Sequence, residues 1–138
     1  MKNRIIPPYL QPGDTIGITC PSGYLPAERI IFAKKTLEAW GYKVIPGSTV
    51  GSSHYYFSDI DDRRLFDLQA LLDNTTVKAI LMGRGGYGLS RIIDRIDFTG
   101  FRSSPKWICG FSDITLLHSH IHAQFGIATL HSPMCSAF

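Results

Sequence analysis

The sequence predicts an α/β fold, a parallel sheet with helices packed on both faces. Three observations support this prediction. Short apolar runs alternate with segments of helical periodicity, turn residues separate the two kinds of segment, and 138 residues suit one domain. Hydrophobic residues make up 44% and charged residues 18% of the chain, which excludes a disordered protein.

The first half of the chain predicts two strands and a helix between them. Residues 14–20 carry Ile16, Ile18 and Cys20 between Pro-Gly and Pro-Ser-Gly turns, as in a buried strand. Residues 26–40 carry apolar side chains at helical spacing, and Gly41 ends that helix. A short strand at 42–45 and a polar loop at 48–57 follow.

Another helix begins near Ser58, because Ser58 and Asp61 resemble a capping box, and it carries Leu65, Leu68 and Leu72 on one face. The remaining elements are a strand at 78–82, a short helix at 89–96, a strand at 106–110, a helix at 113–124 and a strand at 127–131. Strands separated by helices favour a flavodoxin-like or Rossmann-like parallel sheet. Trp40 and Trp107 are expected in the core, and Arg63 and Arg64 on a solvated or ion-paired helix face.

Charge and cysteine content exclude several classes of function. The net charge is +3 with no run of basic residues, so we expect no nucleic-acid partner. Three cysteines without a CxxC pair favour a reducing compartment. Pro7 and Pro8 interrupt the N-terminal segment before a signal peptide could form, and no apolar run is long enough to cross a membrane. We therefore expect a cytoplasmic protein without a membrane partner.

Ser112 is the strongest candidate for chemistry. It follows a predicted strand and precedes a predicted helix, where a sharp turn exposes the hydroxyl as in a nucleophile elbow. The match is partial, because Ile114 stands where the full motif has glycine. The alternative is that Ser112 or Asp113 caps the helix.

The glycine-rich segment 83–88 follows another strand at the same edge. Its amides could approach a developing oxyanion or a phosphate. Gly83, Gly85 and Gly88 fit the spacing of the dinucleotide fingerprint, but the segment follows the third strand rather than the first. A phosphate- or nucleotide-binding flavodoxin-like domain is therefore the alternative function.

Histidines and cysteines give weaker signals. His118 and His122 have a chelating spacing, but no third ligand accompanies them, so we expect no metal and no cofactor. His131 ends a strand at the presumed active edge and could help to shape the site. Cys109 is expected in the core.

Five segments share the order of motifs found in one known family: 10–17 with 21–23, Asp61–Leu68, Arg84–Arg91, Gly110–Thr115 and His131–Met134. Together they resemble the LD-carboxypeptidases, which comprise the muramoyltetrapeptide carboxypeptidases and their microcin-immunity relatives. Ser132 stands where the family commonly has glycine.

The resemblance implies a serine peptidase with a Ser-His-Glu triad that releases a C-terminal D-amino acid, typically D-alanine, from cell-wall muropeptides. Ser112 would be the nucleophile, and the amides of Gly85, Gly86 and Asp113 would form the oxyanion hole. We expect four further residues to bind substrate: Ser22, Arg84, Tyr87 and His131.

The resemblance also implies that residues 1–138 form the N-terminal nucleophile domain. The triad Glu and His of the family lie in a C-terminal domain absent from this chain, so the fragment alone is expected to be inactive. The expected partners are a small peptide, the chain's own C-terminal domain and a possible second copy. A non-catalytic helper domain that forms a dimer or docks a partner, with Ser112 a mere cap, is a third hypothesis.

Overall fold

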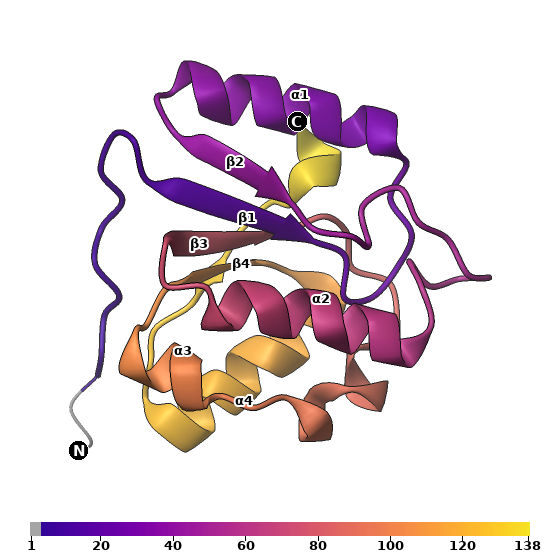
Figure 1. Ribbon diagram of the computed structural model, residues 1–138. Helices are drawn as coiled ribbons and strands as arrows, with labels where there is room; N and C mark the ends of the chain where they lie inside the picture. Colours follow the sequence, from indigo (N-terminus) through magenta and orange to yellow (C-terminus); the bar gives the residue numbers. More distant parts are fainter. Residues whose placement is uncertain (1–3) are drawn as a thin grey trace.

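The computed structural model describes residues 4–138 and contains one five-stranded parallel sheet (Figure 1). The strands are β1 Thr15–Thr19, β2 Lys43–Pro46, β3 Val77–Met82, β4 Trp107–Gly110 and β5 Leu130–His131. Their order is β2-β1-β3-β4-β5, and all neighbouring pairs are parallel. This is the flavodoxin-like strand order, so the predicted α/β fold is confirmed.

Helices cover both faces of the sheet (Figure 1). Helix α1, Ala27–Ala39, lies on one face together with the 3₁₀ turn η4, Cys135–Ala137. Helices α2 Asp61–Asp73, α3 Thr99–Ser103 and α4 Thr115–Phe125 lie on the other. Among residues 4–138, none of the helices combines the length and the apolar character that a membrane crossing requires.

Each face of the sheet has its own apolar core. Helix α1 buries Ile30, Ala33 and Leu37 against β1, at the spacing that the sequence predicted. On the opposite face, α2 contributes Leu68, Leu71 and Leu72 to a second cluster. Both clusters reach the loops at the carboxyl ends of the strands, through Leu25 in one and Met134 in the other.

Three local expectations are wrong. Residues 89–96 form two 3₁₀ turns, η1 Leu89–Arg91 and η2 Ile93–Arg95, because a connector of this length gains little from α-helical nucleation. Ser58 does not cap α2, since its buried hydroxyl donates to the Cys20 carbonyl. Trp40 is 62% exposed because it lies beyond the last turn of α1, beside Phe138.

Candidate active site

The candidate site lies where the strand order reverses, between β1 and β3. In sheets of this class, ligands bind beyond the carboxyl ends of the strands at that point. The structure brings together the loops that follow β1, β3 and β4, which carry Ser22, Gly85 and Ser112. These loops are far apart in sequence, so the sheet topology builds the site.

Ser112 occupies a strained turn directly after β4. Its φ angle is +63°, and Tyr55 is the other non-glycine residue with a positive φ among residues 4–138. The side chain is exposed, and the 3₁₀ turn η3, Ser112–Ile114, leads into α4. Neither η3 nor α4 has a side-chain cap hydrogen bond, so the capping alternative is not supported. A strained, exposed serine between strand and helix is the geometry of a nucleophile elbow.

Gly85 lies against Ser112. A Cβ atom at Gly85 would lie 2.9 Å from the Ser112 Cβ, 3.0 Å from its Oγ and 3.5 Å from the Asp113 amide nitrogen. Only glycine leaves that space open. The structure therefore groups the serine hydroxyl, the Asp113 amide and the Gly85 backbone.

The peptide between Gly85 and Gly86 has a fixed orientation. The Gly85 carbonyl accepts a 2.8 Å hydrogen bond from the Gly23 amide. Because the peptide is trans, the Gly86 N–H points away from Gly23. The φ angle of Gly86 is +103°, a conformation that favours glycine. The glycine segment is followed by 3₁₀ turns rather than by the helix that a dinucleotide site requires, so the nucleotide alternative gains no support.

The Asp113 carboxylate ties three loops together. Its Oδ2 accepts hydrogen bonds from the Ser22 hydroxyl at 2.6 Å and from the Leu89 amide at 3.0 Å. The Ser22 side chain is fully buried, so its hydroxyl has no access to a substrate. We therefore assign Ser22 to the support of the Asp113 turn instead of to the substrate contact expected from the sequence.

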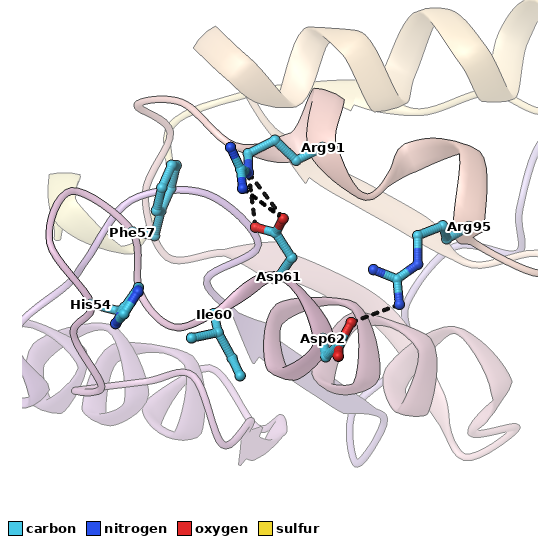
Figure 2. A pocket seen from close by; sticks show the side chains of 7 residues that line it. All are labelled: His54, Phe57, Ile60, Asp61, Asp62, Arg91 and Arg95. Carbon is cyan, nitrogen blue, oxygen red and sulfur yellow. Dashed lines mark hydrogen bonds and ion pairs between the residues drawn. The ribbon is translucent and has the colours of Figure 1, made fainter.

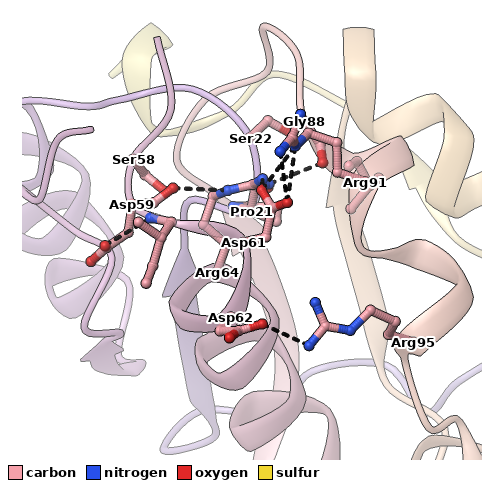
Figure 3. Close-up of polar contacts among 12 residues, drawn as sticks. Pro21, Ser22, Ser58, Asp59, Asp61, Asp62, Arg64, Gly88, Arg91 and Arg95 are labelled. Atoms are coloured by element: carbon pink, nitrogen blue, oxygen red, sulfur yellow. Dashed lines mark hydrogen bonds and ion pairs between the residues drawn. The ribbon is translucent and has the colours of Figure 1, made fainter. Parts of the chain in front are cut away.

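Arg64, on α2, joins the loop after β1 to the loop after β3 (Figure 3). Its guanidinium donates to the carbonyl oxygens of Pro21 and of Gly88, the latter at 3.0 Å, and pairs with Asp61. The side chain is 0% exposed. The expected pairing on a helix face is present with Asp61. The guanidinium is also buried, because backbone carbonyls surround it and supply the acceptors that its charge requires.

Asp61 extends this network to Arg91. The Arg91 Nε lies 2.9 and 3.0 Å from the two Asp61 oxygens, and its Nη2 lies 2.9 Å from Oδ2. These hydrogen bonds from Arg91, followed by that from Arg64, hold the pKa of Asp61 below its usual value.

Asp67, three residues beyond Arg64 on α2, supports the loop after β2. Its buried carboxylate accepts hydrogen bonds from Thr19 Oγ1, Thr49 Oγ1 and the Ser48 amide, each at 2.6 Å. The motif on α2 thus holds the carboxyl-end loops from within the fold. The Asp61–Leu68 motif could be recognised in the sequence, but only the three-dimensional contacts show that Arg64 and Asp67 support these loops.

A hollow of about 370 Å³ lies beside the ion pairs (Figure 2). Its charged side chains are already matched, because Arg91 pairs with Asp61 and Arg95 pairs with Asp62 at 2.7 Å. We assign this hollow to the scaffold rather than to the reacting site.

Two further substrate candidates, Arg84 and Tyr87, are exposed and line another hollow of about 410 Å³, together with Gly86. His131 is exposed on β5, with its ring centroid 6.1 Å from that of Phe111. Arg84, Tyr87 and Gly86 therefore share a surface, whereas His131 lies beside the residue that precedes Ser112.

His118 is buried on the inner side of α4. Its Nε2 lies 2.9 Å from the Gly110 carbonyl, at the end of β4, and burial lowers its pKa. The neutral ring donates to that carbonyl and holds the strand end before Ser112. No group of three or more His, Cys, Asp or Glu side chains in residues 4–138 could hold a metal ion.

These features define a class of α/β domains in which a serine at a strained strand-to-helix turn faces the backbone of a glycine loop. Within that class, the chain belongs to the LD-carboxypeptidase family, since residues 16–132 match the LD-carboxypeptidase N-terminal domain. This confirms the resemblance found in the sequence.

Individual relatives agree with this family membership. The chain is 39% identical over 130 residues to a protein of Bacillus subtilis named probable murein peptide carboxypeptidase. The match covers 94% of this chain and 41% of that protein. Among solved structures, an MccF-like protein from Bacillus anthracis matches with a TM-score of 0.85 and 30% identity, over 96% of this chain and 41% of that one. A muramoyltetrapeptide carboxypeptidase from Oxalobacter formigenes matches with a TM-score of 0.78 and 28% identity, over 88% of this chain and 40% of that one. The chain thus spans about two fifths of the length of these proteins.

Proposed function

We propose that this chain is the nucleophile domain of a serine LD-carboxypeptidase that releases a C-terminal D-amino acid, typically D-alanine, from murein peptides. One observation carries the proposal: the exposed Ser112 hydroxyl lies at a strained turn, beside Gly85 and the Asp113 amide. The printed names of the relatives, which include murein peptide and muramoyltetrapeptide carboxypeptidases, support the substrate class.

In the proposed reaction, Ser112 Oγ attacks the carbonyl carbon of the last peptide bond and forms an acyl-enzyme. The serine proton passes through a base to the leaving amine, and water then hydrolyses the ester. The developing oxyanion is stabilised by the amides of Asp113 and of the Gly85–Gly86 turn. The orientation of the Gly86 N–H, opposite to the carbonyl held by Gly23, supports this role.

The base is proposed to come from a second domain. Among residues 4–138, no histidine or carboxylate forms a hydrogen bond with the Ser112 hydroxyl. Serine is a weak nucleophile without a base. The three free cysteines of the described chain support the cytoplasmic location that forms part of this proposal.

The test compares the 138-residue chain with the same chain joined to the remaining C-terminal portion of the Bacillus subtilis relative. Both are incubated with an L,D-tetrapeptide, and released D-alanine is measured. We expect release from the joined protein, none from the chain alone, and none from joined protein carrying Ser112→Ala. Release by the chain alone, or by the joined Ser112→Ala variant, would contradict the proposed division of roles.

A further inference from the structure

The carboxyl-end loops contain a single permanently charged basic residue. Residues 21–24, 83–88, 111–113 and 131–134 include Arg84 and no other lysine or arginine. The Arg84 side chain is exposed, and its one hydrogen bond within residues 4–138 runs from Nη1 to the Tyr24 carbonyl at 3.0 Å. That bond leaves most of its five N–H donors free.

Arg84 differs from the other arginines near the site. Arg64, Arg91 and Arg95 each form an ion pair with a carboxylate of α2. No carboxylate of the described chain lies within 4.0 Å of the Arg84 guanidinium. Its charge is therefore available to a ligand.

Arg84 belongs to the same loop as the glycine beside Ser112. Arg84 precedes Gly85, the residue that lies against the serine, and consecutive Cα atoms are about 3.8 Å apart. Arg84 and Gly86 line the hollow of about 410 Å³, whose other walls are Gly23, Tyr56, Phe57 and Tyr87.

We propose that Arg84 binds the free terminal carboxylate of the peptide whose last bond is cleaved. This inference rests on the proposed function. It names Arg84 as the group that restricts cleavage to the last peptide bond of the substrate. The terminal carboxylate lies one residue beyond the scissile carbonyl, and Arg84 is the basic residue of the loop that carries the glycine beside Ser112. A guanidinium fits a carboxylate with two parallel hydrogen bonds, whereas a C-terminal amide lacks the charge.

The experiment uses the 138-residue chain with Ser112→Ala, which prevents turnover. N-acetyl-L-lysyl-D-alanine and its C-terminal amide are titrated separately, and the backbone amide resonances of Gly86 and Tyr87 are followed by NMR. We expect the free acid to bind roughly tenfold or more tightly than the amide, the range for a charged hydrogen-bond pair. Adding Arg84→Gln should abolish the difference, whereas adding Arg95→Gln, in an exposed arginine of another hollow, should preserve it.

The outcomes separate this inference from the proposed function. Equal responses to acid and amide, including no response to either, would overturn the role of Arg84. Retention of the preference in the Arg84→Gln variant would also overturn it. Failure of the proposed function is recorded separately, as absence of Ser112-dependent D-alanine release from the joined protein.

Discussion

Gly85 and Ser112 pack so closely that only one of them can carry a side chain. A Cβ atom at Gly85 would lie 2.9 Å from the Ser112 Cβ and 3.0 Å from its Oγ. We expect Gly85→Ala to lower the free energy of unfolding by about 1–3 kcal/mol, as overpacking does. Because the clash involves the Ser112 side chain, adding Ser112→Gly should recover most of that loss.

Urea denaturation of the two single variants and the double variant measures this coupling. Gly100→Ala in α3 is the matched control, because a Cβ there meets mainly the end of the exposed Asp73 side chain. Additive effects of Gly85→Ala and Ser112→Gly would show that the two residues do not compete for this space.

The positive φ of Ser112 gives a second prediction. Its angle of +63° strains any residue with a Cβ atom, whereas glycine adopts it freely. We expect Ser112→Gly to be more stable than Ser112→Ala by roughly 0.5–1 kcal/mol, although glycine usually lowers stability. Thermal denaturation measures the stabilities of the two variants. An alanine variant as stable as the glycine variant would argue against backbone strain at Ser112.

Arg64 is expected to contribute more to stability than its neighbour Arg63. Arg64 is fully buried among carbonyl oxygens and Asp61, whereas Arg63 is exposed. Arg64→Met should cost about 3 kcal/mol of unfolding free energy because it leaves buried acceptors unpaired. Arg63→Met should change it by less than about 0.5 kcal/mol. Similar losses in both variants would contradict the importance of the buried network.

Asp113 allows a test of the tie between the three loops. Asp113→Ala removes the acceptor used by Ser22 and by the Leu89 amide, and we expect a loss of about 1–3 kcal/mol. Asp113→Asn should restore most of it, since both bonds end on one oxygen and the amide carbonyl can replace it. Chemical denaturation measures both variants, and an asparagine variant as unstable as the alanine variant would contradict this assignment.

The depressed pKa of Asp61 predicts an acid-sensitive contribution to stability. Arg91 and Arg64 favour the ionised carboxylate in the folded protein, so the unfolded chain binds the proton first as the pH falls. The contribution is complete above the unfolded value of 3.8 and is lost as the pH falls through the lower folded value.

We therefore expect Asp61→Asn and Arg91→Gln to flatten the decline of unfolding free energy below about pH 4. Arg63→Gln, at an exposed arginine of the same helix, should leave the wild-type slope. The measurement is urea denaturation between about pH 3 and pH 6, and equal slopes in wild type and Asp61→Asn would contradict the pKa assignment.

The sequence predicted the sheet because hydrophobic periodicity and turn residues report local structure. The helix face of Ile30, Ala33 and Leu37 is one example. Ser112 was found for the same reason, since a serine between a strand and a helix is a local signal. Such signals place a residue at the correct edge of the sheet.

The supporting contacts could not be predicted in this way because they join distant segments. The partner of Ser22 is Asp113, 91 residues away, and the partners of Arg64 are backbone carbonyls, which any sequence provides. A local charge pattern predicts a solvated arginine unless nearby residues in the sequence supply its acceptors. The burial of Arg64 therefore follows from the topology and not from its neighbours in sequence.

The chain order of the site also governs when it can form. Ser22, Gly85 and Ser112 follow β1, β3 and β4, and β3 lies between the other two strands in the sheet. Closing these long-range contacts is the slow, entropically costly part of folding. The strained turn at Ser112 therefore depends on contacts between segments far apart in the chain, and we expect it to form together with the central strands rather than before them.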